Sequence, residues 1–441
     1  MFAVTLIFAS TASPALDRQP NADYHARRVA LANKLNGGVA VLFAAEEPLL
    51  DFMPYRQDAD FYYLTGWNEP GAALLIEAPQ AAQGTHPARP YREIMFLPTR
   101  NLRMELYTGK KLDAAAPDAT QLTGIDEVKM MSDLAVTLNQ MAAENRVAAY
   151  RIWSEPDTEQ AKALVQWTAT TLGMDSAPPF SDVRTPVQQL RATKDAGELA
   201  LLHKASDASV QAQFAMMKSV HPGQKERTTT GIIYEKLLEN GCERPSYAPI
   251  VGSGEKSTEL HYSDNSQTMQ DGDVVVVDAA GEYSMYASDI TRTMPVNGRF
   301  SARQREIYDI VLGAQKAAIE GFVAGKSHIN DPQHKYPDSL DTIAFNYMNA
   351  HGKDLHGEQL GKYFIHGIGH SVGIDVHDPY DYTQPIQKGM VFTIEPGIYI
   401  PEEKIGVRIE DVFYVDQYGK LVDLTEALPK DAEAVEKAMR K

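Results

Sequence analysis

The chain has 441 residues, and 44% of them are hydrophobic, so we expect two domains with packed cores and not a disordered chain. It carries 42 Lys and Arg against 59 Asp and Glu side chains, a net charge of −17. There is no basic run, which argues against nucleic acid or an anionic membrane surface as a partner and favours a solvated acidic surface. The single cysteine, Cys242, excludes disulfides and thiolate clusters within the chain, and we interpret it as a small core residue.

The first fifteen residues, "MFAVTLIFASTASPA", form a short apolar run followed by small side chains. This order is typical of the apolar core and cleavage site of a signal peptide, although the basic residues that normally precede the core are absent. The run of about nine apolar residues is too short to span a bilayer. We therefore treat residues 1–20 as a signal-like segment that favours a periplasmic or exported protein. The alternative is a buried first strand in a cytoplasmic one.

The first third of the chain alternates strands and helices. Residues 37–44 are a buried-strand run, residues 59–66 are an aromatic run that ends in a turn, and residues 72–78 and 92–98 are further strands. Residues 161–172 have helical spacing.

Periodicity is then lost over residues 173–186, where proline and polar side chains accumulate. Such a stretch is typical of a connection between domains. We therefore predict an N-terminal domain over residues 21–180 and a C-terminal domain over residues 181–441.

The C-terminal part begins with helical spacing after Lys194. We expect four helices, the third with Ser301 as its N-cap, over residues 195–220, 230–241, 301–323 and 339–352. We expect strands over residues 273–283, 389–400 and 406–415. This order predicts an α+β domain in which helices cover one face of a mainly antiparallel sheet.

Three histidines lie close together in residues 364–378, "FIHGIGHSVGIDVHD". His366 and His370 have the four-residue spacing of a helical zinc site, but three glycines interrupt the stretch, and each glycine inside a helix costs about 1 kcal/mol. After Gly373 apolar and polar residues alternate as in a strand. The stretch therefore predicts imidazoles on strand-like backbone.

Four acidic side chains interrupt apolar strands. Asp278 follows four valines, and Asp289 comes eleven residues later, which suits a neighbouring antiparallel strand. Glu395 follows an apolar run, and Glu410 or Asp411 lies within another. Because an unpaired buried carboxylate costs several kcal/mol, such groups are normally paired or bound to metal. One of them alone would favour a satisfied core acid, but four of them beside three histidines indicate a metal site.

Carboxylates and imidazoles without thiolates are ligands of divalent ions such as Mn, Co or Zn. The set exceeds the three protein ligands of a single catalytic zinc. It suits two ions about 4 Å apart, with a bridging hydroxide as the nucleophile. Arg408 lies two residues before Glu410, so on a strand both side chains point to the same face, where Arg408 can orient a ligand carboxylate.

The chain resembles the pita-bread metallopeptidases in five motifs that occur in the same order: "ELHYSDN", "VVVVDAAGEYSMYASDITRTMPVNGRF", "HGIGHSVGIDVHD", "TIEPGIYI" and "GVRIED". Within this family it is most similar to the proline-specific members, aminopeptidase P and prolidase. Residues 54–76 and 98–112 are similar to the creatinase-type N-terminal domain of bacterial aminopeptidase P. The resemblance therefore covers residues 25–440. It implies a pita-bread catalytic domain, a smaller α/β N-terminal domain and a homo-oligomer, either dimer or tetramer.

The resemblance also implies roles for single residues. The metal ligands would be Asp278, Asp289, His370, Glu395 and Glu410. His261 would be an outer active-site histidine, His377 would hydrogen-bond the scissile carbonyl, and His366 would line the pocket for the proline ring. Glu395 would also pass a proton to the proline nitrogen, and Arg408 and Tyr399 would lie beside this network.

Two residues of the N-terminal domain match positions that approach the mouth of the site in this family, sometimes in a neighbouring subunit. They are Arg56 and Asp60. The alternative for both is a solvated turn with a local ion pair.

The resemblance implies an enzyme that cleaves the bond between an N-terminal residue and a penultimate proline, with manganese as the expected ion and cobalt or zinc as alternatives. A prolidase, which cleaves only dipeptides, is the alternative activity, because the five motifs are common to both. The segment between Glu395 and Glu410 is shorter than in many aminopeptidase P sequences, so the accepted peptide length stays open. A non-catalytic peptide-binding module of the same fold is disfavoured, since all five ligand positions carry the expected residue.

Overall fold

The computed structural model describes residues 16–47, 55–82, 88–143, 152–155, 159–160, 162–164, 166 and 180–440. Most of the signal-like segment, most of the predicted helix over residues 161–172 and the first part of the predicted domain boundary lie outside the described residues. No helix in the described part of the chain is both long and apolar enough to cross a bilayer.

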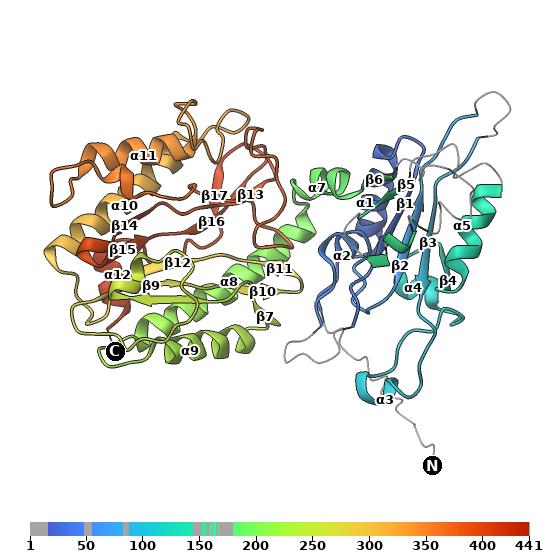
Figure 1. Ribbon diagram of the computed structural model, residues 1–441, viewed down its shortest axis with the longest axis horizontal. Coiled ribbons are helices and arrows are strands. Elements are labelled where there is room, and N and C mark those ends of the chain that lie inside the picture. The colour runs from blue at the N-terminus through green and yellow to red at the C-terminus, as the bar shows by residue number, and fades with distance from the viewer. Residues whose placement is uncertain are drawn as a thin grey trace, which may run out of the picture.

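The N-terminal domain contains a six-stranded mixed sheet in the order β4-β3-β2-β1-β5-β6. Its strands are β1 (Val39–Phe43), β2 (Ala73–Glu77), β3 (Arg92–Leu97), β4 (Glu127–Met130), β5 (Ile152–Ser154) and β6 (Phe180–Asp182). Alternate side chains of the central strands pack on opposite faces: Ala40 and Leu42 of β1 contact one hydrophobic cluster, whereas Val39 and Val41 contact another. Helices α1 (Asn21–Lys34) and α2 (Ala59–Thr65) cover the first face and α5 (Asp133–Ala143) covers the second (Figure 1).

The predicted strands over residues 37–44, 72–78 and 92–98 are confirmed as β1, β2 and β3. The aromatic run over residues 59–66, which we grouped with the strands, is instead the helix α2. The side chain of Asp58 accepts a hydrogen bond from the backbone of Phe61 at its start, and Gly66 ends it with φ of 60°. These two end signals outweigh the strand propensity of the aromatic residues. Besides α2, four helices of this domain were not predicted: α1, α5 and the short α3 (Glu105–Thr108) and α4 (Ala119–Thr123).

The C-terminal domain is built from small antiparallel sheets. One has the order β12-β9-β8 and a second the order β13-β16-β17, while β14 pairs with β15 and β10 pairs with β7 and β11. Their bounds are β7 (Arg244–Pro245), β8 (Ile250–Ser253), β9 (Val274–Asp278), β10 (Gly281–Tyr283), β11 (Tyr286–Ala287), β12 (Thr291–Pro295), β13 (Val391–Ile394), β14 (Gly397–Ile400), β15 (Ile405–Arg408), β16 (Asp411–Val415) and β17 (Leu421–Asp423). An isolated bridge between Thr291, the first residue of β12, and Glu410, the residue before β16, connects the first two sheets.

Long helices cover these sheets (Figure 1). They are α8 (Ala196–Ser219), α9 (Glu226–Glu239), α10 (Ala302–Gly321) and α11 (Leu340–His351), with the shorter α7 (Arg184–Arg191) before them and α12 (Ala432–Ala438) at the C-terminus. Helix α8 packs against β10 and β11, and α10 packs against β13, β14 and β15. The four predicted helices are confirmed, and Ser301 caps α10, although α9 begins four residues earlier than we predicted.

Each of the three long strands predicted in this domain is two strands. The break follows Asp278 between β9 and β10, contains Glu395 between β13 and β14, and contains Glu410 between β15 and β16. At each break the chain leaves one sheet and joins another, which the continuous apolar pattern could not show. The strand predicted after Gly373 is wrong, because residues 374–377 form bends closed by the hydrogen bond from the backbone of Asp378 to that of Ser371.

Buried ion pairs connect the two domains. Arg191, at the end of α7, donates to Asp60 of α2 at 2.6 Å and to Asp378 of the C-terminal domain at 2.6 Å. Arg56 donates to Glu282 of β10 at 2.7 Å. The local ion pair considered for Arg56 and Asp60 is therefore wrong, because both side chains bind residues more than 100 positions away. The domain boundary predicted between residues 180 and 181 falls inside β6 and stays a prediction.

Candidate active site

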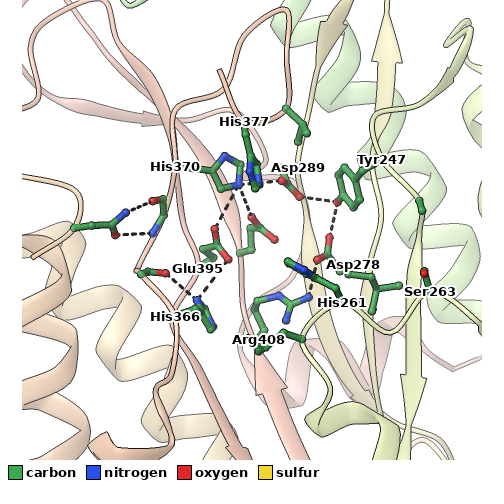
Figure 2. A pocket seen from close by; sticks show the side chains of 18 of the residues that line it. Tyr247, His261, Ser263, Asp278, Asp289, His366, His370, His377, Glu395 and Arg408 are labelled. Atoms are coloured by element: carbon green, nitrogen blue, oxygen red, sulfur yellow. Dashed lines mark hydrogen bonds and ion pairs between the residues drawn. The ribbon is translucent and has the colours of Figure 1, made fainter. Parts of the chain in front are cut away.

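A cavity of about 550 Å³ lies where the small sheets of the C-terminal domain meet (Figure 2). Nine of the ten predicted site residues line it: His261, Asp278, Asp289, His366, His370, His377, Glu395, Arg408 and Glu410. The tenth, Tyr399, lies directly behind this wall, where its hydroxyl contacts His366 and Arg408.

The four predicted ligand carboxylates come from strand ends that the sheet register brings together. Asp278 ends β9, and its register partner is Thr291, the first residue of β12, so Asp289 lies close by. The bridge between Thr291 and Glu410 then brings in the second sheet. Asp278, Asp289 and Glu410 are all buried, so these charges converge where water does not screen them.

His370 faces this carboxylate cluster (Figure 2). Its Nε2 lies 3.2 Å from Asp289 Oδ2 and 3.5 Å from Glu395 Oε1. Its Nδ1 lies 3.2 Å from the backbone oxygen of Ser371, which fixes the proton on Nδ1 and leaves Nε2 turned to the carboxylates. Ligand atoms of Asp289, His370 and Glu410 all lie within 4.8 Å of one another, close enough to hold one metal ion.

The sequence left open whether Glu410 or Asp411 belongs to the acidic cluster, and in the structure their side chains point in opposite directions. Glu410 lines the cavity and accepts a hydrogen bond of 2.6 Å from the hydroxyl of Thr291. Asp411 is fully buried on the other side, where it accepts a hydrogen bond of 2.6 Å from Arg292. Asp411 is therefore a paired core acid.

The cluster carries more negative charge than its surroundings balance. Burial, and then the neighbouring carboxylates, raise the pKa of Glu410 well above its ordinary value. Burial raises the pKa of Glu395 to about 7, although His370 opposes this. Arg408 is the one arginine that lines the cavity, where lysine is absent among the described lining residues, and its Nη2 lies 2.6 Å from Asp278 Oδ2. A divalent cation fits this oxygen-rich donor set and would relieve the repulsion.

The other histidines surround the cluster. The Nε2 atom of His366 lies 2.9 Å from the hydroxyl of Tyr399, and burial lowers the pKa of His366 to about 4, so its imidazole is neutral. His377 packs its ring on that of His370 with 4.0 Å between the ring centroids. Within the described part of the chain, the imidazoles of His377 and His261 make no hydrogen bond to protein groups, and both residues are exposed.

Two comparisons with protein families decide the class of this protein. Residues 200–417 match metallopeptidase family M24, and residues 24–153 match the N-terminal domain of aminopeptidase P. The chain belongs to metallopeptidase family M24. The predicted family and the predicted fold, a pita-bread domain behind an aminopeptidase P N-terminal domain, are confirmed.

Similar proteins support this assignment over nearly the whole chain. The Xaa-Pro aminopeptidase of Haemophilus influenzae is 34% identical, over 88% of this chain and 89% of its own length. That of Escherichia coli is 33% identical, over 95% of this chain and 97% of its own length. The structure of aminopeptidase P from E. coli with the inhibitor Pro-Leu matches with a TM-score of 0.82 at 30% identity, covering 96% of this chain and 99% of that one. A putative aminopeptidase P from Bacillus anthracis matches with a TM-score of 0.83 at 26% identity, covering 96% and 98%.

The protein is thus a metallo-aminopeptidase that uses divalent metal. Its site contains residues that sequence reasoning missed. The hydroxyl of Tyr247 lies 2.5 Å from Asp278 Oδ1 and 2.6 Å from Asp289 Oδ1, and so connects two predicted ligands of this M24 peptidase. A tyrosine between prolines in "RPSYAP" gives no signal of such a role. Thr291 is one of three consecutive polar residues, with Arg292 and Thr293, in a strand that is buried throughout, so alternation does not single it out either.

Proposed function

We propose that this M24 peptidase is an Xaa-Pro aminopeptidase, which releases the N-terminal residue of a peptide whose second residue is proline. The observation that carries the proposal is the cavity itself, where a carboxylate cluster faces two exposed imidazoles, His261 and His377, that make no hydrogen bond within the described part of the chain. The names of the most similar relatives support the same activity.

Two divalent ions, with manganese expected, are held in this proposal by the predicted ligands Asp278, Asp289, His370, Glu395 and Glu410. Four carboxylates and one imidazole support two ions, since a single catalytic ion needs only three protein ligands. When bound, the ions supply Lewis-acid polarisation of the scissile carbonyl and activation of the attacking water.

The protein side chains complete the reaction. His377 Nε2–H donates a hydrogen bond to the oxygen of the scissile carbonyl and stabilises the charge that develops there. Glu395 passes a proton to the proline nitrogen, which leaves as a secondary amine once it is protonated. The neutral ring of His366 lies against the proline ring of the substrate, and His261 closes the outer side of the cavity.

The scarcity of cationic side chains among the described residues that line the cavity favours an aminopeptidase over a dipeptidase. A dipeptide would place its free carboxylate inside the site, where it needs a cationic partner. The charge of Arg408 is already paired with Asp278, and its guanidinium also donates to Thr291 and Tyr399. Longer peptides keep their carboxylate outside the cavity.

The test is hydrolysis of Gly-Pro, Arg-Pro-Pro and a longer Xaa-Pro peptide by protein stripped with chelator and reloaded with Mn, Co or Zn. Metal-dependent release of only the first residue from the longer peptides would establish the aminopeptidase. Activity confined to Gly-Pro would make the protein a prolidase, and no turnover with any metal would refute the proposal.

A further inference from the structure

Two buried glutamines stand behind the carboxylate cluster, one on each of two covering helices. Gln213 of α8 donates from Nε2 to the backbone oxygen of Ala279 at 2.9 Å and to that of Ile290 at 3.1 Å. Each of these acceptors directly follows one of the two predicted aspartate ligands, Asp278 and Asp289. A single amide group thus spans the backbone beside both aspartates.

Gln315 of α10 makes the same kind of contact in the other half of the domain. Its Nε2 donates to Asp411 Oδ2 at 2.8 Å. It also lies 3.0 Å from the backbone oxygen of Ile394 and 3.3 Å from that of Ile409. These residues directly precede Glu395 and Glu410, and a backbone oxygen shares its rigid peptide plane with the nitrogen of the next residue. Gln315 therefore holds the two peptide groups from which the glutamate ligands begin.

The opposite ends of those two peptide groups are also held. The backbone nitrogen of Glu395 donates to Ile368 at 2.8 Å, and that of Glu410 donates to Thr291 at 3.1 Å. Each glutamate ligand therefore begins from a peptide group held at both its oxygen and its nitrogen.

The broken strands explain why side chains are needed here. Where a strand changes sheets, backbone oxygens can lose ladder partners, and a buried one without a partner costs as much free energy as a lost hydrogen bond. Of the oxygens contacted here, that of Ile290 also accepts from the backbone nitrogen of Ala279 at 3.1 Å. Gln213 and Gln315 are almost completely buried, and their Oε1 atoms have no hydrogen-bond partner among the described residues. The amide nitrogens of both glutamines donate hydrogen bonds, whereas their amide oxygens accept none from the described residues. We infer that the two side chains act as hydrogen-bond donors.

We propose that Gln213 and Gln315 are positioning residues that set the spacing of the two ligand pairs, Gln213 for the aspartates and Gln315 for the glutamates. This inference rests on the ligand set of the proposed function. Because the carboxylates are fixed through the backbone beside them, loss of either glutamine lowers the affinity for divalent metal and not only the stability of the fold.

The experiment compares Gln213→Met and Gln315→Met with the matched control Gln304→Met. Methionine keeps the length of the side chain and removes its donors. Gln304 is also buried on α10 and donates from Nε2 to Gly272 at 2.8 Å, at the far end of β9 from Asp278. Each full-length protein is stripped with chelator, its unfolding midpoint is measured, and it is then titrated with Mn²⁺ by calorimetry.

We expect all three variants to unfold at lower temperature than the parent in chelator. Mn²⁺ affinity should fall about 10- to 100-fold for Gln213→Met and Gln315→Met, the range found when groups that orient metal ligands are removed. For Gln304→Met it should stay within about twofold of the parent, because no ligand lies beside its acceptor. The loss of Mn²⁺ affinity should be larger for Gln315→Met than for Gln213→Met, since Gln315 holds the peptide groups of the ligand residues themselves.

Histidine variants keep the test decisive if the methionine variants do not fold. The Nε2–H of histidine has about the reach of the glutamine amide and restores one donor. Gln213→His and Gln315→His should keep a parent-like unfolding midpoint and still lose several-fold in Mn²⁺ affinity. Parent-like Mn²⁺ affinity in all folded variants would overturn the inference while leaving the proposed function intact. A parent that binds no divalent ion would overturn both.

Discussion

The hydroxyl oxygen of Tyr399 lies 2.8 Å from Nη1 of Arg408, and this contact fixes the direction of a chain of hydrogen bonds through the site. Arginine can only donate, so the tyrosine hydroxyl accepts from Arg408 and must give its own proton to Nε2 of His366, 2.9 Å away. The same guanidinium donates to Asp278 at 2.6 Å. The neutral state of His366 and the position of Asp278 therefore depend on one buried arginine.

Replacing Tyr399 with phenylalanine should lower kcat on an Xaa-Pro peptide about tenfold, because His366 loses its proton donor and Arg408 loses an acceptor. Bound metal, measured by elemental analysis after dialysis, should stay the same. The matched control is Tyr308→Phe, which removes a buried hydroxyl that donates at 2.7 Å to the backbone oxygen of Lys430, away from the cavity. The control should lose about 1 kcal/mol of stability and keep its kcat. Equal kcat for both variants would contradict the role of the chain.

The excess charge of the carboxylate cluster predicts that the effect of Glu410→Gln on stability depends on metal. In chelator the variant should unfold at the same temperature as the parent or higher, because it removes one of several repelling buried charges and its remaining oxygen still accepts from Thr291. With Mn²⁺ present the order should reverse, since binding at 100 times Kd stabilises the parent by about 2.7 kcal/mol and the variant by less. Thermal unfolding of the variant and the parent, with and without Mn²⁺, measures both differences in stability.

A second buried glutamate provides the control for this reversal. Glu226 accepts hydrogen bonds from the backbone and hydroxyl of Ser253, both at 2.8 Å, and does not line the cavity. Glu226→Gln should therefore change stability by the same amount with and without Mn²⁺. If Glu410→Gln behaves as Glu226→Gln does, then Glu410 is not a ligand.

The acids and histidines of the site could be predicted because each contradicts its local pattern. Asp278 after four valines and the glycine-interrupted histidines have no ordinary structural explanation, so the chemistry of the residues pointed to a metal. Gln213, Gln315 and Tyr247 could not be found in this way. A glutamine within a helix or a tyrosine before a strand fits its surroundings, and its partners lie tens of residues away along the chain.

The strand breaks were missed for a related reason. An apolar run predicts burial but not which sheet the strand joins. At Glu395 the chain passes from a sheet with β16 to one with β15. Strands β13 and β14 are both buried throughout, so the apolar pattern is the same on the two sides of the Glu395–Pro396 interruption. The two-residue alternation correctly placed Arg408 and Glu410 on the same side, since both line the cavity.

The glycines around His370 predict a graded response to alanine. A Cβ at Gly369 would lie 2.1 Å from the backbone oxygen of Thr393, so either the loop or β13 must move. A Cβ at Gly367 would lie 2.6 Å from the end of the Asn330 side chain, which can move away only by giving up its hydrogen bond of 2.7 Å to the backbone oxygen of Gly369. Gly369→Ala should therefore lower the free energy of unfolding by at least about 3 kcal/mol and remove much of the metal affinity. Gly367→Ala should lower the free energy of unfolding by less than about 1.5 kcal/mol. Chemical unfolding and Mn²⁺ titration of both variants would show the order, and equal losses would contradict it.

A buried acid far from the cavity makes stability depend on pH. Glu198 of α8 is 2% exposed, accepts from the hydroxyl of Tyr286 at 3.2 Å, and lies 3.5 Å from Arg27 of the N-terminal domain. Burial raises its pKa from 4.5 to about 7, although Arg27 opposes the shift. The folded protein therefore binds this proton more tightly than the unfolded chain does.

Glu198→Gln should remove that dependence. A raised folded-state pKa adds stability that is complete below pH 4.5 and is lost as the pH rises through about 7. Glutamine has no proton to lose, and its oxygen can still accept from the backbone of Asp195 in the capping box. Between about pH 5 and pH 8 the free energy of unfolding of the variant should therefore rise relative to that of the parent by about 2–3 kcal/mol. Its activity should be unchanged, since the residue does not line the cavity. Guanidinium unfolding of both proteins at pH 5, 6, 7 and 8 measures the difference, and a difference that stays constant with pH would show that Glu198 is ionised in both states.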